Sequence, residues 1–572
     1  MAGRSLGAPD RWAIALVLVA ATAGLYAAVI AWTGGFDLRV TGVRVSSHNW
    51  IRPALFALLI GIPSAVVARS AIAAALRAGW AIANRPRTGV VLALAATALT
   101  LVAGLMFGTF AAGGADSYGY LSQAKLFAAR HLTEAIPSSP SFTWDNAPAT
   151  LTPLAYTRAA EPDRMAPVYP PGLPLLLAPL TWAGDWAPFA LVPLSGALLV
   201  WAVFAIGRAL GDPLAGAAGA ALLSASATFL YQLVQPMSDV PAAACWTLAL
   251  LLARGNGAAA GLLTGLAILI RPNLAPLAAI VLVVAWLYAP PAARYRRMAV
   301  FCTIAGACVA LLAWIQFVRY GSPLASGYGS ASDLFSASHI VPNLERYPRW
   351  LSEAYTPFIW LFALGPLWIR TTARPRVLAW AVYAMALAVF ALYLPYVYFQ
   401  PDEWFYTRFL LPGIGLLLVL ACGVALTAIR RLPGAVGIVV IVAGGAAGAA
   451  SLLLRAEERG VFTLRRQEQK YLAAGAFVRD RLPRTAVVFA MQHSGSIRFY
   501  ADRVTVRWDL LPPRALDDAL GSLRRGGLEP YAVLDAGEVP AFRERFAGAT
   551  PAAVNGMTLV AVVGDAQVYR FE

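Results

Sequence analysis

Long apolar runs recur along most of this chain, and they constrain its fold more than any other feature. The runs are about 15–25 residues long, which suits helices that cross a hydrocarbon core of about 30 Å. Only 13% of the residues are charged, against about 25% in an ordinary soluble domain. We therefore expect a mainly α-helical, polytopic membrane protein.

We predict about thirteen membrane-spanning helices, with an uncertainty of a few residues at each end. The first run, Trp12 to Trp32, is long and no small-residue cleavage site stands out after it, so we expect a retained span rather than a cleaved signal. The predicted spans lie near residues 12–32, 52–68, 88–112, 186–208, 213–231, 237–253, 256–270, 273–289, 298–318, 354–370, 376–397, 408–429 and 433–454.

Basic residues indicate how these helices are oriented. The net charge is +16, but the arginines gather in short loops between apolar runs, which is typical of cytoplasmic loops rather than of a nucleic-acid-binding surface. With the N-terminus inside and an odd number of spans, the C-terminus lies outside; the loop 33–51, with Arg39 and Arg44, fits this orientation least well. The clustered arginines are Arg69, Arg77, Arg85, Arg87, Arg294, Arg296, Arg297, Arg370, Arg374, Arg376, Arg430 and Arg431.

Cysteine and histidine usage argues against a disulfide framework or a zinc site. The four cysteines all fall inside apolar runs, and neither they nor the four histidines show metal-ligand spacing. These residues are Cys245, Cys302, Cys308, Cys422, His48, His131, His339 and His493.

The sequence predicts three regions: two N-terminal spans in 1–87, a membrane core in 88–455, and an extracytoplasmic domain in 456–572. The core carries two long outer loops, 113–185 and 319–353, and loops of this length are often functional. The first of them has a helix-like start, from Tyr120 to Arg130. In the C-terminal region, β-branched runs alternate with helical patterns, which indicates a small α/β domain. It has no Gly-rich phosphate-binding motif, so we expect it to be accessory.

Polar motifs interrupt or border the apolar runs, and in this topology all of them fall on the outer side. Ionisable residues at membrane depth cost about 2.5–3.5 kcal/mol each, so a convergent set predicts a water-filled cavity that opens outward. The motifs are "GADSYGY" with Asp116 and Tyr118, "VYPPGLP" with Tyr169, "QPMSDVP" with Asp239, "IRPN" with Arg271, "SGYG" with Tyr328, and "QPDEWFYTRFLLP" with Glu403, Tyr406 and Arg408.

Each of these residues also has a purely structural interpretation. Asp116 could simply end a span, and Asp239 could cap a helix that starts at Pro241. Arg271 and Arg408 could extend to phosphate headgroups at the membrane surface. Tyrosines at such borders are most often interfacial anchors. Both interpretations stay open at the level of sequence.

The order of these motifs resembles that of GT-C-type membrane glycosyltransferases. The nearest kin would be the bacterial relatives of protein O-mannosyltransferases and of the aminoarabinose transferase that modifies lipid A. The resemblance covers roughly residues 88–430, and it rests on the order and topology of "YPPGLPLLLAP", "QPMSDVPAAACW", "LAILIRPN", "YGSPLASGYG" and "YTRFLLP". No single motif is specific to the family on its own.

The resemblance implies a hexosyl- or pentosyltransferase of the inner membrane. Such enzymes move a sugar from a polyprenyl-phosphate carrier to an extracytoplasmic glycan, lipid or protein, usually with inversion. Asp116 matches the catalytic carboxylate of the first outer loop. Many relatives have an acidic pair there, whereas here Ser117 follows Asp116, and this departure argues against a metal ion at this position. A divalent metal stays an open alternative, with Asp239 as a candidate second acid.

The residue types suit that chemistry independently of the resemblance. A hydroxyl acceptor is a poor nucleophile, and a nearby carboxylate such as Asp116 can take its proton during attack. The leaving group is an anionic phosphate, which the planar guanidinium of Arg271 or Arg408 can bind through two oxygens. The further candidates for substrate binding are Asp239, Tyr118, Tyr169, Tyr328, Glu403 and Tyr406.

Two other function classes compete with an enzyme. A transporter or lipid flippase would place ionisable residues near the bilayer midplane and show inverted repeats, neither of which the sequence indicates. A membrane-anchored binding protein would act through the C-terminal domain. The sequence does not identify the sugar or the acceptor.

Overall fold

The computed structural model describes residues 8–33, 36–40, 43–47, 49–398 and 404–572. The chain forms two compact units, one made of residues 1–88 and 428–445, the other of residues 89–427 and 446–572. One division between these units falls after residue 88. The C-terminal region, in contrast, belongs to the same unit as the membrane core.

The first unit consists mainly of helices. Helices α1 (Ala8–Thr33) and α2 (Ile51–Val67) pack along each other, and α2 meets α3 (Arg69–Ala83) at a bend of 88°. Between α1 and α2, strands β1 (Phe36–Val40) and β2 (Val43–Ser47) form an antiparallel hairpin, so the predicted loop 33–51 has regular structure.

Helices account for 71% of the chain, in line with the expected mainly helical class. Each of the thirteen predicted ranges overlaps a helix, but among the described residues only six helices are long and apolar enough to cross a membrane, or eight if each bent pair counts as one span. The six are Pro86–Phe107 (α4), Ala187–Ala209 (η2, Ala187–Ala190, with α8, Leu191–Ala209), Pro291–Tyr320 (η4, Pro291–Ala293, with α14, Arg294–Tyr320), Arg376–Tyr393 (α18), Trp404–Ile429 (η7, Trp404–Leu410, with α19, Leu411–Ile429) and Gly434–Glu458 (α20).

The remaining core helices are shorter. Their apolar residues are buried against neighbouring helices, so tertiary packing supports segments that could not span alone. They are α9 (Pro213–Ala225), α10 (Ala227–Leu233), α11 (Asp239–Leu252), α12 (Gly257–Ile270), η3 (Pro272–Leu277), α13 (Ala278–Tyr288), η6 (Pro357–Leu364) and α17 (Gly365–Thr371).

The outer helices of the second unit expose apolar side chains. Val91 and Leu99 on α4 are exposed, as are Trp314 and Phe317 on α14. A soluble protein rarely shows such continuous apolar faces, whereas lipid solvates them readily. These faces fit a membrane-embedded core.

Two arginine-containing loops of the second unit contact the ends of other helices. The backbone N–H of Arg374 donates to the carbonyl of Leu210, just after α8, at 3.0 Å, and Arg297 Nη2 donates to the carbonyl of Gly255, just after α11, at 2.9 Å. The opposite end of α11 begins at Asp239, in one of the polar motifs.

Residues 113–185 contain more regular structure than the sequence indicates. Helix α5 (Asp116–Ala128) starts at Asp116 itself, four residues before the predicted helical start at Tyr120. A three-stranded antiparallel sheet of order β3-β5-β4 follows, and α7 (Gly172–Leu177) packs against α5. The other elements are β3 (Glu134–Ala135), α6 (Ala147–Thr150), β4 (Tyr156–Arg158), β5 (Arg164–Pro167) and η1 (Ala178–Ala183).

The second outer segment also differs from the expected loop 319–353. Helix α14 extends to Tyr320, and α15 (Ala331–Leu334) and η5 (Ala337–His339) lead into a long helix, α16 (Ile340–Tyr355). Helix α16 buries Tyr347, Trp350 and Leu351 on one face, which makes it amphipathic rather than continuously apolar.

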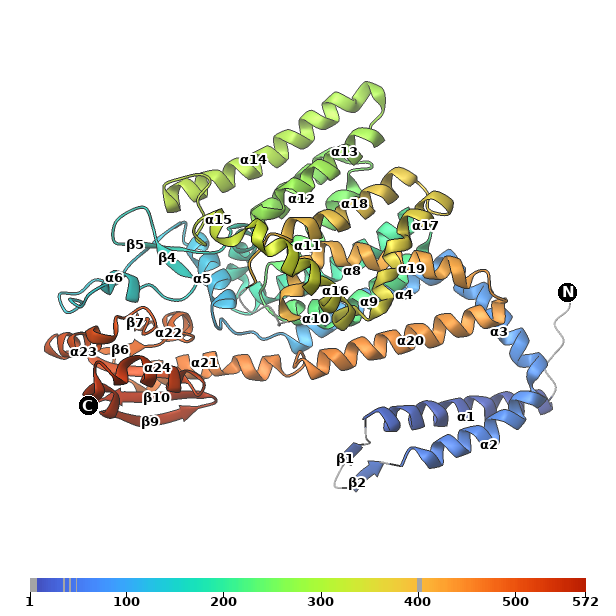
Figure 1. Ribbon diagram of the computed structural model, residues 1–572, viewed down its shortest axis with the longest axis horizontal. Coiled ribbons are helices and arrows are strands. Elements are labelled where there is room, and N and C mark those ends of the chain that lie inside the picture. The colour runs from blue at the N-terminus through green and yellow to red at the C-terminus, as the bar shows by residue number, and fades with distance from the viewer. Residues whose placement is uncertain (1–7, 34–35, 41–42, 48, 399–403) are drawn as a thin grey trace. The chain divides into compact units, whose positions relative to one another are not determined.

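The C-terminal region holds a five-stranded mixed sheet of order β7-β6-β8-β10-β9, with β6 parallel to β7 and β8, and β10 antiparallel to β8 and β9 (Figure 1). One hydrophobic core joins it to residues 113–185, since Tyr118 and Tyr169 cluster with Phe489 and Phe571. Its elements are α21 (Leu464–Arg481), β6 (Ala486–Phe489), α22 (Ser494–Ala501), β7 (Thr505–Val506), η8 (Pro513–Ala515), α23 (Leu516–Arg525), β8 (Glu529–Asp535), α24 (Glu538–Ala547), α25 (Pro551–Asn555), β9 (Met557–Val563) and β10 (Ala566–Phe571).

Candidate active site

A cavity of about 440 Å³ lies where the polar motifs of the second unit converge. Its wall comes from segments far apart in the sequence: the start of α5, the turn before α7, the starts of α11 and η3, the end of α14, and η7. The charged and aromatic side chains at this wall are Asp116, Tyr120, Tyr169, Asp239, Arg271, Arg319, Tyr320, Tyr328, Phe335, Tyr393, Tyr396, Arg408 and Phe409.

Asp116 lies in the first turn of α5 and is held from two sides. Tyr169 Oη donates to its Oδ1 at 2.5 Å, and Arg408 Nη1 donates to its Oδ2 at 3.1 Å. The start of a helix favours a negative charge. Burial raises the pKa of Tyr169 well above its ordinary value, and the charge of Asp116 raises it further, so the hydroxyl stays protonated and donates.

The approach of Tyr169 to α5 depends on a glycine. A Cβ atom on Gly119 would lie 2.4 Å from Tyr169 Cε2, closer than any real contact. Any larger residue at position 119 would therefore displace the ring that hydrogen-bonds Asp116.

Asp239 forms a second carboxylate–guanidinium pair. It is the first residue of α11, and Arg271 Nη2 donates to its Oδ1 at 2.6 Å, while Arg271 Nη1 donates to Tyr393 Oη at 3.0 Å. The Asp239 side chain is 1% exposed. Helix α11 already starts at Asp239, so the cap position belongs to Ser238, and the structural interpretation of Asp239 as the cap of a helix starting at Pro241 is wrong.

Both guanidinium groups lie over one aromatic ring. The Cζ atoms of Arg271 and Arg408 are each 5.0 Å from the centre of the Phe409 ring, and Arg408 also lies 4.1 Å from that of Phe405. Cation–π contacts of this kind hold two like charges in the same region. In the described part of the chain, Nε of each arginine and Oδ2 of Asp239 are buried without a hydrogen-bond partner, which is typical of a site built for a polar ligand.

Tyrosines from three segments form one side of the cavity. The Tyr169 ring centre lies 4.7 Å from that of Tyr120 and 5.9 Å from that of Tyr328. Tyr120 Oη donates to Ser238 Oγ at 2.9 Å, next to Asp239 in the chain. Such flat, hydroxyl-tipped surfaces suit a sugar ring, which presents both apolar C–H faces and hydroxyl groups.

Among the residues that the structure describes, the side chains of this wall do not form a donor set for a divalent metal. Both oxygens of Asp116 already accept hydrogen bonds, and one oxygen of Asp239 pairs with a guanidinium. Nowhere in the described ranges do three or more His, Cys, Asp or Glu side chains gather as a metal-binding group. Ser117, which follows Asp116, is buried and does not line the cavity.

The structure brings together six of the residues that the sequence singles out: Asp116, Tyr169, Asp239, Arg271, Tyr328 and Arg408. Two others do not line the cavity. Tyr118 is buried against Tyr156 and Phe499, and Tyr406 packs among aromatic residues around Tyr398. Glu403 lies outside the described residues.

Sequence reasoning missed several residues of the wall. Tyr120 lies four positions after Asp116 in α5, which places both on one helical face, so a correct helix start would have identified it. Phe409 adjoins Arg408 and could be suspected on that ground. Tyr393 and Tyr396 lie at the end of an apolar run, where tyrosines usually anchor a span. No feature of the sequence marks them as residues of the cavity wall.

No protein-family model and no curated protein matches the sequence. Among solved structures, the chain is similar to apo ArnT from Cupriavidus metallidurans, with a TM-score of 0.52 and 16% identity over 85% of this chain and 98% of that chain. Weaker matches are the same protein bound to undecaprenyl phosphate (TM-score 0.49, 15% identity, 84% of this chain and 98% of that chain) and the oligosaccharyltransferase AglB from Archaeoglobus fulgidus (0.46, 13%, 84% and 74%). These proteins are GT-C glycosyltransferases, and the chain shares the fold of apo ArnT.

Proposed function

We propose that this chain is a membrane glycosyltransferase that moves a sugar from a polyprenyl-phosphate donor to an acceptor outside the cytoplasm, with inversion. The observation that carries the proposal is the convergence of two carboxylate–guanidinium pairs, Asp116–Arg408 and Asp239–Arg271, on one cavity. The GT-C fold supports a reaction of this class. The roles proposed for individual residues rest on the geometry of the cavity and not on the fold.

The guanidinium groups of Arg271 and Arg408 bind the donor phosphate. Both are permanently charged, and a planar guanidinium can donate two parallel hydrogen bonds to phosphate oxygens. As the bond between the sugar and the phosphate breaks, negative charge grows on the leaving oxygen, and fixed positive groups favour that change. The buried Nε–H groups are donors available for this contact.

Asp116 acts as the general base. It accepts the proton of the acceptor hydroxyl while the oxygen of that hydroxyl forms a bond to the anomeric carbon. The bond from that carbon to the phosphate oxygen breaks with its electron pair, so polyprenyl phosphate leaves. One displacement of this kind inverts the anomeric configuration, and no covalent sugar–enzyme intermediate is needed.

The ion pair between Asp116 and Arg408 couples donor binding to activation of the base. The donor phosphate and the Asp116 carboxylate compete for the same guanidinium. Donor binding draws Arg408 toward the phosphate and frees one carboxylate oxygen for the acceptor. Tyr169 still donates to the other oxygen and keeps the carboxylate in place.

A transporter or lipid flippase is the alternative. It would require ionisable groups along a path through the bilayer. The carboxylate–guanidinium pairs gather instead at one cavity whose wall is formed where helices begin or end, which favours chemistry at one membrane surface.

Mass analysis of polyprenyl-phosphate sugars and envelope glycans from a deletion strain tests the function. A glycosyltransferase predicts an accumulated lipid-linked sugar and one missing glycan modification, which together identify both substrates. An unchanged glycan profile with an altered distribution of a lipid between leaflets would favour a flippase instead.

A further inference from the structure

We infer that the C-terminal region positions the active site, because it holds the segment from which Asp116 projects. The inference rests on the proposed role of Asp116, and it replaces the expected accessory role of residues 456–572. Five successive observations support it.

Side chains of the C-terminal region hold the backbone just before Asp116. Tyr500 Oη accepts a hydrogen bond from the backbone N–H of Ala112 at 2.7 Å, and Gln469 Nε2 donates to the carbonyl of Thr109 at 3.0 Å. These groups come from α22 and α21. A loop held by two hydrogen bonds from another region has few conformations left.

Two glycines let this loop pass directly over α21. A Cβ atom on Gly113 would lie 2.2 Å from Tyr471 Cδ2 and 2.4 Å from Glu468 Oε2, and Gly114 has a φ of +54°. The close contact leaves no space for a side chain at 113, and the positive φ favours glycine at 114. The loop is therefore shaped to the surface of α21.

The same loop carries the first turn of α5. The backbone N–H of Tyr118 donates to the carbonyl of Gly113 at 3.2 Å, and that of Gly119 donates to the carbonyl of Ala115 at 2.9 Å. Any shift of Gly113 is thus transmitted to the turn in which Asp116 lies. The position of the carboxylate depends on how Gly113 rests on Tyr471 and Glu468.

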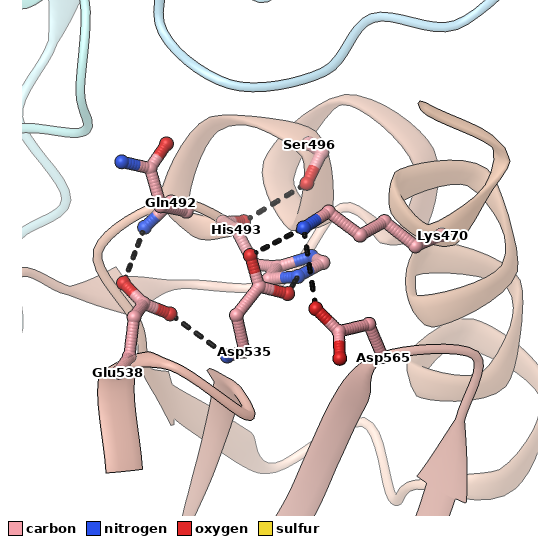
Figure 2. A network of polar contacts seen from close by, with 7 residues as sticks. All are labelled: Lys470, Gln492, His493, Ser496, Asp535, Glu538 and Asp565. Atoms are coloured by element: carbon pink, nitrogen blue, oxygen red, sulfur yellow. Dashed lines mark hydrogen bonds and ion pairs between the residues drawn. The ribbon is translucent and has the colours of Figure 1, made fainter. Parts of the chain in front are cut away.

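A polar network fixes the part of the C-terminal region beneath the loop (Figure 2). Asp535 pairs with Lys470 Nζ at 2.6 Å and with His493 Nε2 at 2.9 Å, while the carboxylate of Glu538 accepts from the backbone N–H groups of Gln492 and Asp535 at 3.2 and 2.9 Å. Burial alone would raise the pKa of Asp535, but hydrogen bonds from His493 and Lys470 outweigh it and lower the pKa. The ionised carboxylate thus joins α21, the β6–α22 connection and the end of β8.

Helix α22 packs directly against α5, and this contact explains why Tyr118 is buried away from the cavity. A Cβ atom on Gly495 would lie 2.2 Å from Tyr118 Cδ1, and Ser494 Oγ accepts from the backbone N–H of Leu154 at 3.0 Å. Tyr118 therefore serves as an anchor between α5 and the C-terminal region. It is a positioning residue, whereas Asp116 on the same helix contacts substrate.

Positioning of this kind has a measurable effect on rate. Catalytic groups must lie within about 0.5 Å of their productive geometry, and a displacement of about 1 Å can cost about 100-fold in rate. We therefore test Tyr500→Phe, which removes one hydroxyl, against Tyr531→Phe. Tyr531 is also buried in the C-terminal region, but its hydroxyl donates to Glu529, away from the loop.

We expect Tyr500→Phe to lower kcat about tenfold while KM for the lipid-linked sugar stays within twofold and the melting temperature stays near that of Tyr531→Phe. Hydrogen–deuterium exchange of the full-length protein provides a readout that does not depend on turnover. The peptide containing Ala112 should exchange at least tenfold faster in Tyr500→Phe than in the wild type. Equal exchange and equal kcat in both variants would overturn the inference.

A second pair of variants tests the contact at Gly113. Gly113→Ala should lower kcat about tenfold or more, and adding Tyr471→Ala in the same chain should restore part of it by making room for the new methyl group. Full activity in Gly113→Ala would contradict the positioning role. If the wild type itself transfers no sugar, the proposed function fails, and the exchange experiment still decides whether the C-terminal region holds the loop.

Discussion

Arg408 and Asp116, separated by 292 positions in the sequence, form an ion pair of 3.1 Å in the wall of one cavity. The pair neutralises each partner, and it places the proposed proton acceptor beside the proposed phosphate-binding group. The closeness of these two functions has a consequence for substrate binding.

Asp116→Asn should abolish sugar transfer without weakening donor binding. The neutral amide cannot act as the base, whose contribution is about 100- to 10,000-fold in rate, but it also no longer competes for Arg408. Undecaprenyl phosphate should therefore bind to this variant as tightly as to the wild type, or more tightly. Single-turnover transfer and a lipid-binding titration measure the two effects, with Asp145→Asn, at an exposed site in the same outer segment, as the control. Retained turnover would remove Asp116 as the base.

Arg408→Lys should weaken binding of undecaprenyl phosphate about tenfold, because an ammonium group cannot reproduce two hydrogen bonds in a fixed plane. The matched control is Arg130→Lys, at an exposed position after α5. The same titration measures both variants. Unchanged affinity in Arg408→Lys would show that this guanidinium does not bind the phosphate.

Asp239→Asn should destabilise the protein by about 3 kcal/mol, because it leaves the buried Arg271 guanidinium without its counter-charge. Thermal unfolding in detergent should show a melting temperature several degrees lower than in Asp185→Asn, whose site is exposed. An unchanged melting temperature would mean that Arg271 finds another anionic partner.

Stability should depend on pH through Glu468. Burial raises the pKa of its carboxyl to about 7, with Lys470 opposing and Asp535 adding to the shift. The unfolded chain loses this proton near pH 4.3, so between about pH 4.3 and 7 the folded state holds more protons, and stability falls as the pH rises through that window. Above about pH 7 the contribution is constant.

Glu468→Gln removes this titration. The fall in melting temperature from pH 5 to pH 8 should be smaller in Glu468→Gln than in the wild type, by the equivalent of about 1–3 kcal/mol. Glu544→Gln, at an exposed site of α24, should behave like the wild type. Parallel pH profiles for all three proteins would contradict the raised pKa.

Much of the site could be predicted from the sequence because its charged residues lie at the ends of apolar runs. Asp116, Asp239, Arg271 and Arg408 each stand at one end of an apolar run, and alternation of spans brings those ends to one face. The topology alone therefore predicts that they meet. The pairing of Arg408 with Asp116 rather than with Asp239 depends on side-chain packing, which no run of apolar residues encodes.

Tyr118 shows how a boundary error misleads. With α5 starting at Tyr120, Tyr118 belongs to a loop and could face the substrate. Because α5 starts at Asp116, Tyr118 lies two positions along the helix and points away from the face that Asp116 and Tyr120 share. Its true neighbour, Gly495, comes from the C-terminal region and could not be inferred from local sequence.

The common hydrophobic core of Tyr118 and Phe571 has a consequence for biogenesis. During synthesis, helix α5 emerges early, but the packing partners of its inner face are made only when β10 is complete. The nascent protein would thus remain inactive until β10 has packed against this core. A chain truncated before β10 would insert into the membrane but would lack activity.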